Sequence, residues 1–131
     1  MLEDVRNDII ASFLLQKSVL TEVQLDTILA SDVNGNLEYR SGLREKGKVS
    51  KGAFARTLGQ GRKNIESSVY TLLLASYLNL VSPESLTQFS RTSGMLAQLR
   101  DAGADREDLL RVIEAMQQFV RGFVRKRKVI L

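Results

Sequence analysis

The sequence contains no cysteine and no histidine among its 131 residues. Without cysteine there is no disulfide framework and no thiol nucleophile. Without histidine the chain lacks the most common general base, the most common zinc ligand and the usual pH-sensitive group. Carboxylates are present, but no pair of them stands in a recognisable catalytic pattern, and there is no glycine-rich phosphate loop. We therefore expect a protein that is not an enzyme and that needs no metal and no cofactor.

Long hydrophobic runs are also missing, and proline occurs only once. No apolar stretch reaches the length of a membrane span, and the N-terminus does not have the layout of a secretory signal peptide. Apolar residues make up 44% of the chain, which is normal for a folded globular protein. These features predict a soluble, cytoplasmic protein of one domain, or of one domain with a dimerisation extension.

Start signals of helices recur along the chain. Residues 2–17 carry apolar side chains at helical spacing, and Thr21 with Gln24 three positions later has the pattern of a capping box. Ser82 followed by Pro83 indicates another helix start, because serine is a good N-cap and proline suits the first helical position. The predicted fold class is all-α, or mainly α with a minimal wing.

The stretch from residue 50 to residue 79 has the pattern of two helices joined by a glycine turn. Ser50 is a good N-cap for the first helix. Gly59 stands where that helix would end, because glycine adopts the left-handed conformation of such a turn without a Cβ clash. Ile65 then begins the apolar face of a second, longer helix. A plain helical hairpin is the alternative interpretation of this pattern.

Basic residues gather around the same stretch. Residues 40–63 contain eight basic residues against one acidic residue, a net charge of +7, whereas the whole chain carries +4. Clustered positive charge on a helix pair favours binding to phosphates, and a solvated surface is the alternative. A second basic cluster, residues 121–128, either contacts phosphates or complements the negative end of a helix dipole.

The spacing of Ala55, Gly59 and Ile65 resembles the helix-turn-helix of DNA-binding proteins. That motif has a small residue in its first helix, a turn glycine four positions later and an apolar residue six positions after the glycine. With its flanks, the stretch of residues 20–81 is similar to winged-helix transcription regulators of the MarR type, which dimerise through terminal helices. Gln60 departs from the pattern, since an apolar residue usually follows the glycine, and no wing-like hairpin follows residue 80.

The resemblance implies a DNA-binding domain over residues 1–81, with its motif at 50–79, and a helical dimerisation region over residues 82–131. It also implies that the second helix of the motif enters the major groove, with other basic side chains on the phosphates. The candidate DNA-binding residues are Arg44, Lys48, Lys51, Arg56, Gln60, Arg62, Lys63 and Ser67.

Two apolar rows run side by side between residues 109 and 124. The first row has heptad spacing and consists of Leu109, Val112, Met116, Phe119 and Phe123. The second row consists of Leu110, Ile113, Val120 and Val124. Since two rows are wider than one contact needs, one can pack within the chain and the other on a second copy. We predict a homodimer and take the first row as the dimerisation residues; a buried helix of a monomeric bundle is the alternative.

Together these patterns predict a transcription regulator that binds double-stranded DNA as a dimer and is associated with the nucleoid. A sequence-tolerant DNA-organising protein is the first alternative, because charge alone supports it equally well. A helical adaptor that binds other proteins is the second.

Overall fold

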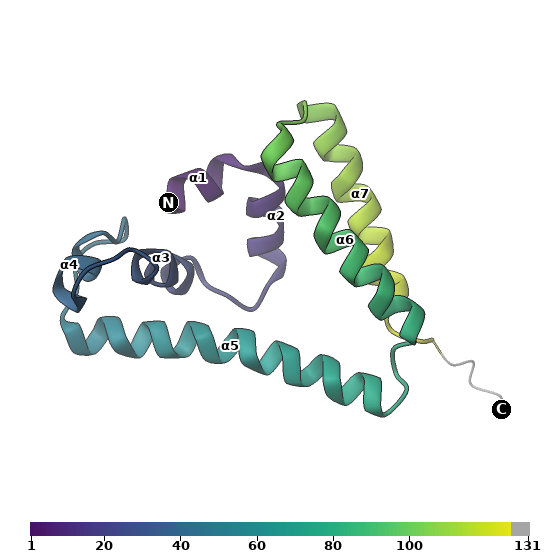
Figure 1. The fold of residues 1–131 in the computed structure, drawn as a ribbon, viewed down its shortest axis with the longest axis horizontal. Helices are drawn as coiled ribbons and strands as arrows, with labels where there is room; N and C mark the ends of the chain where they lie inside the picture. Colours follow the sequence, from purple (N-terminus) through teal and green to yellow (C-terminus); the bar gives the residue numbers. More distant parts are fainter. Residues whose placement is uncertain (127–131) are drawn as a thin grey trace. The chain divides into compact units, whose positions relative to one another are not determined.

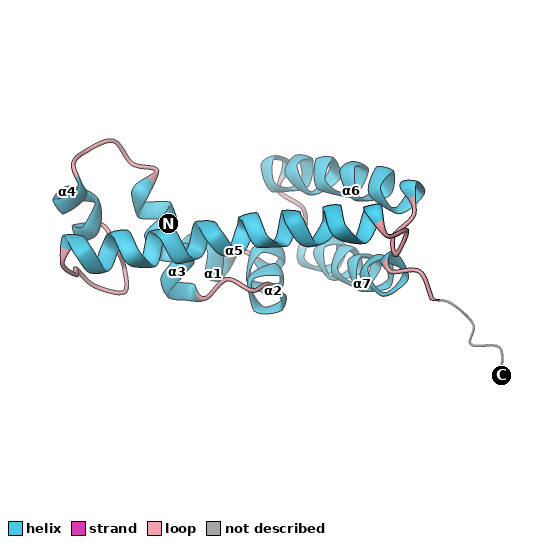
Figure 2. Cartoon of the chain, turned by 90° about the horizontal axis from the view of Figure 1, so that it is seen from below, coloured by secondary structure: helices cyan, strands magenta, loops and turns pink. Residues whose placement is uncertain are grey.

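The computed structural model describes residues 1–126 (Figure 1). The last part of the predicted basic cluster, residues 127 and 128, and the end of the predicted dimerisation region lie outside the described residues. Within residues 1–126 the chain forms helices joined by loops, with no strand, so the prediction of a mainly helical protein is confirmed (Figure 2). The helices are α1 (Leu2–Asn7), α2 (Ile9–Lys17), α3 (Glu22–Ser31), α4 (Leu37–Gly42), α5 (Lys51–Tyr77), α6 (Pro83–Ala102) and α7 (Arg106–Phe123).

The chain divides into two compact units, and the boundary falls inside α5, after Val69. The first unit contains α1 to α4 and the first part of α5. Its core is formed by Ala30 of α3 with Phe54 and Leu58 of α5. Partly buried apolar side chains surround this cluster: Met1, Ile28, Leu37, Leu43 and Val49.

The predicted helix over residues 2–17 is interrupted. Asp8 has an extended backbone conformation between α1 and α2. Its carboxylate accepts a hydrogen bond from the amide of Ala11 at 2.9 Å. Asp8 is therefore the N-cap of α2, and a local side-chain hydrogen bond compensates the amide left free by the break.

The predicted turn at Gly59 is wrong, because α5 is one continuous helix of 27 residues. Gly59 does not have a positive φ, and a Cβ atom placed there would meet nothing within 4 Å. The reason lies at Gly61, which is buried and where a Cβ atom would stand 2.9 Å from the Cδ1 atom of Ile28 on α3. Phe54, Leu58 and Gly61 lie on one helical face, so packing against α3 continues past Gly59 and keeps the chain helical.

The loop between α4 and α5 is held by two buried polar side chains. The Asp26 carboxylate on α3 is fully buried and accepts hydrogen bonds from the amides of Glu45 at 3.2 Å and Lys46 at 2.8 Å. The Ser41 hydroxyl donates to the carbonyl of Val49 at 2.7 Å and accepts from its amide at 3.2 Å. These bonds determine where α5 begins.

The second unit contains the end of α5 together with α6 and α7. Ser82 caps α6 and Pro83 is its first residue, as predicted. Gly103 ends α6 with a φ of 68°, and Asp105 caps α7 by accepting from the amide of Asp108 at 2.9 Å. The two helices form a hairpin with an apolar groove of about 410 Å³ between them. In the described residues no two-stranded wing follows α5; Val81 makes only an isolated β-bridge.

Gly59→Ala should raise the free energy of unfolding by about 0.5–1 kcal/mol, because alanine is the better helix former and the new methyl group meets no neighbour. Gly61→Ala is the matched comparison and should be less stable than Gly59→Ala, because its methyl group presses on Ile28. Urea denaturation measures both. A Gly59→Ala variant that loses stability would mean that a turn forms there after all.

Asp26→Ala should destabilise the protein by about 3–5 kcal/mol, because it leaves the buried Arg44 guanidinium without its counter-charge and two loop amides without an acceptor. Glu38→Ala is the control, since it removes a carboxylate from an exposed 3.8 Å pair with Lys48 and should cost less than about 1 kcal/mol. Equal losses for the two variants, measured in urea, would contradict the role assigned to Asp26.

Candidate nucleic-acid interface

Arg44, one of the predicted DNA contacts, is buried. Only 5% of its side chain is exposed, and its Nε atom lies 3.9 Å from the Asp26 carboxylate. That Nε atom has no hydrogen-bond partner, so the pair is held by charge and burial rather than by a direct hydrogen bond. Arg44 therefore serves the fold, because the buried Asp26 carboxylate needs a nearby positive charge and Arg44 supplies it; a DNA contact by this buried side chain stays an untested prediction.

Lys46 also forms an ion pair within the fold, but this pair lies at the surface. Its ammonium group lies 2.9 Å from the carboxylate of Glu22 on α3, and Arg6 of α1 binds the same carboxylate at 2.8 Å. The hydrogen bond from Arg6, followed by that from Lys46, lowers the pKa of Glu22 to about 2. Glu22 thus joins α1 and the α4–α5 loop to α3.

Two further basic residues ahead of α5 have partners within the chain. Arg40 donates hydrogen bonds to the carbonyls of Gly35 at 2.7 Å and Ser31 at 3.3 Å. Lys48, a predicted DNA contact, is exposed and lies 3.8 Å from the carboxylate of Glu38. This pair is long and solvated, so Lys48 remains accessible but carries a neighbouring negative charge.

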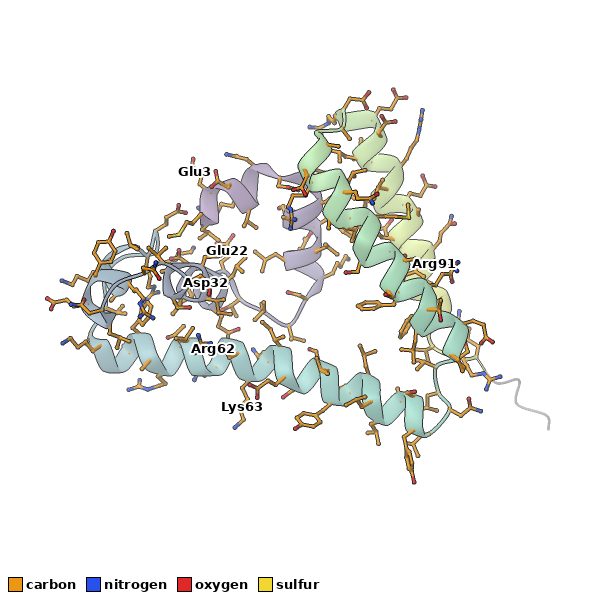
Figure 3. All side chains as sticks on the ribbon, in the orientation of Figure 1. Glu3, Glu22, Asp32, Arg62, Lys63 and Arg91 are labelled. Carbon is orange, nitrogen blue, oxygen red and sulfur yellow. The ribbon has the colours of Figure 1, made fainter. Side chains whose placement is uncertain are left out.

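The other four basic residues of this stretch lie on α5: Lys51, Arg56, Arg62 and Lys63. All four are exposed, and none makes an ion pair with another described residue. The Lys63 side chain points away from the side of α5 that faces α3 (Figure 3). Arg44 and Lys46 each pair with a carboxylate of the fold, whereas these four side chains do not.

Helical geometry arranges these four cations in two rows. Lys51 and Arg62 are three turns apart and lie within about 20° of each other around the axis. Arg56 and Lys63 are two turns apart and lie in a second row, about 100–120° from the first. The strip between the rows consists of Gly52, Ala55 and Gly59, all exposed. We call these seven residues the basic face.

The remaining predicted DNA contacts, Gln60 and Ser67, are exposed and lie beside the Arg56–Lys63 row. Glu66 marks the end of the basic face, one turn beyond Arg62. The strip of small residues was not predicted from the sequence. Its signal is the alternation of small residues with cations at helical spacing, which can be recognised only when the helix is known to be continuous.

The predicted dimerisation row turns toward α6 of the same chain. Met116 is only 6% exposed, and Val112 and Phe119 line the groove between α6 and α7. The ring of Phe123 packs in edge-to-face geometry with the rings of Phe89 on α6 and of Phe119. Leu109 is half-buried. This row therefore makes contacts within the chain, and homodimerisation stays a prediction.

Because the pKa of Glu22 is lowered in the folded protein, the free energy of unfolding depends on pH in the acid range. Since the pKa is about 2 in the folded protein and 4.5 for an unperturbed glutamate, its contribution is present above pH 4.5 and is lost as the pH falls toward 2. Glu22→Gln should lower stability at neutral pH and flatten the acid-induced loss below pH 4.5. Urea titrations across this pH range test the prediction; an unchanged acid-side slope would contradict it, and Glu38→Gln is the control.

In the described residues, no group of three or more histidine, cysteine, aspartate or glutamate side chains could hold a metal ion. None of the described helices is long and apolar enough to cross a membrane. Comparisons of the chain with protein-family models, with curated proteins and with solved structures find no match. The basic face is therefore the feature of the described chain that bears on function.

Proposed function

We propose that the protein binds double-stranded DNA through the basic face of α5. The observation that carries the proposal is the set of four exposed cations without ion-pair partners among the described residues, arranged in two rows on one rigid helix. Cations that serve the fold are paired or buried, as Lys46 and Arg44 are. Cations held on a helix without such partners are available for phosphates.

The two-row arrangement suits the major groove of DNA. The groove is about 12 Å wide and accepts an α-helix, with a phosphate backbone along each of its sides. A helix lying in it can direct Lys51 and Arg62 to one backbone and Arg56 and Lys63 to the other. Gly52, Ala55 and Gly59 project little from the helix, so they allow its backbone to approach the base edges closely.

Two roles follow from such binding. A dimeric transcription regulator requires base recognition, for which Arg62 and Gln60 are the candidates, because arginine can bind guanine and glutamine can bind adenine with two hydrogen bonds. A sequence-tolerant DNA-organising protein requires only phosphate contacts. The second role is favoured by the strip between the rows, which has no polar side chain to recognise base edges. Either role places the protein with the nucleoid in the cytoplasm.

Lys51→Ala and Lys63→Ala should each weaken binding to all duplex sequences alike. Each should also make the dependence of log K on log salt shallower by about one ion, because each removes one phosphate contact. Lys17→Ala is the matched control, since Lys17 is exposed but lies on α2; it should leave the salt dependence unchanged. Fluorescence anisotropy with labelled duplexes at several salt concentrations provides the measurement.

Arg62→Ala distinguishes the two roles. If Arg62 recognises a base, the variant should lose about 1–3 kcal/mol on a preferred site and show relaxed preference at one position. If it contacts phosphate only, the loss should be equal on preferred and random duplexes. Unchanged affinity for the Lys51, Arg62 and Lys63 variants, with helix content intact by circular dichroism, would leave the basic face as a solvated surface and reject DNA binding.

A further inference from the structure

The second apolar row of α7 is uncovered in the described structure. Leu110 is 48% exposed and Val120 is 65% exposed. With Ile113 and Gln117, which are half-buried, they are spaced three, four and three residues apart. This spacing is the seam of a coiled coil, with one polar residue, Gln117, among apolar ones.

The α6–α7 hairpin has little core of its own. No residue of α6 is buried, and Met116 is the only buried residue of α7. The row that faces α6 and the row that contains Leu110 and Val120 are about 100° apart around α7. Helices of a four-helix bundle contact their two neighbours at similar angles. A second helix packed on the Leu110–Val120 row would therefore give the hairpin the layer that it lacks.

Charge along one flank of this row indicates what that second helix is. Glu114 and Arg121 are exposed, lie one heptad apart and make no ion pair with another described residue. Glu107 and Asp108 in the first turn of α7 are already paired with Arg111 of the same helix, so Glu114 and Arg121 are the charges left on this flank. A helix with this distribution is complementary to an antiparallel copy of itself.

We propose that two copies of the chain pair through α7, antiparallel, with the Gln117 side chains at the two-fold axis. Glu114 stands three positions before Gln117 and Arg121 four positions after it, so this pairing places Glu114 of each chain beside the partner's Arg121. Leu110, Ile113 and Val120 are buried across the seam. The two Gln117 amides face each other and hydrogen-bond, which sets the register because any shift would bury them unpaired.

This interface deepens the dimer of the proposed function and does not depend on DNA. It differs from the row that the heptad pattern first indicated, because Met116 and Phe119 already pack against α6. In the pairing proposed here, the α6–α7 hairpins of both chains form a four-helix bundle.

Single cysteine variants test the position of the axis, since the chain has no cysteine of its own. Gln117→Cys should form a disulfide-linked dimer rapidly under mild oxidation, because the two thiols face each other at the axis. Gln118→Cys is the matched control: it changes the neighbouring glutamine, which is exposed on the other side of α7, and should cross-link only at the slow rate of collisions. Equal cross-linking of the two variants would contradict the pairing.

Charge reversal tests the antiparallel direction. Glu114→Arg and Arg121→Glu should each raise the dimer dissociation constant about tenfold, because each turns two attractive pairs into repulsive ones. An equimolar mixture of the two variants should form heterodimers in preference to either homodimer, since both charge pairs are restored. Sedimentation equilibrium of the variants and their mixture measures both effects, and no preference for the heterodimer would overturn the antiparallel arrangement.

A wild-type chain that sediments as a monomer at high micromolar concentration would also overturn the proposal. These measurements are made without DNA. A negative result would therefore reject the α7 dimer without rejecting DNA binding. A monomer that still binds duplexes in a way that depends on Lys51 and Lys63 would remove this interface and leave the basic face intact.

Discussion

The structure of the first unit depends on one buried carboxylate, that of Asp26. A buried charge is stable only with hydrogen bonds and an opposite charge, and Asp26 obtains both from the α4–α5 loop. The loop is thereby tied to α3, and α5 begins at a defined place on the core formed by Ala30 and Phe54. The orientation of every side chain on the first half of α5 follows from that start.

The same constraint sorts the basic residues by use. Arg44 neutralises Asp26, and Lys46 joins Glu22, so the cations that precede α5 belong to the fold. On α5, Arg56 and Lys63 lie opposite the face that packs on α3, Lys51 and Arg62 lie beside that face, and none of the four makes an ion pair with another described residue. Because α5 is continuous, the spacing of its cations is set by helix geometry and not by a turn. The net charge of the stretch does not distinguish the basic residues that stabilise the fold from those on α5. Their burial and their ion pairs do.

Local signals in the sequence predicted the caps correctly. Thr21, Ser50 and Ser82 each accept the amide hydrogen bond expected of an N-cap, since capping depends on residues within one turn. Gly59 was mispredicted because a glycine can end a helix or continue it, and the contact of Gly61 with α3 decides the outcome. The burial of Asp26 was not predictable for a similar reason: the partners that compensate its charge are about 20 residues away in the chain.

The central claim is that duplex DNA lies on the basic face of α5. Lysine acetylation followed by mass spectrometry tests it directly, because Lys51 and Lys63 lie in different rows of that face while Lys17 lies on α2. With excess duplex DNA, both Lys51 and Lys63 should become resistant to acetylation, and Lys17 should react as it does in the free protein. If Lys51 and Lys63 react at the same rate with and without DNA at a concentration that saturates binding, the account of α5 as the DNA-binding element is contradicted.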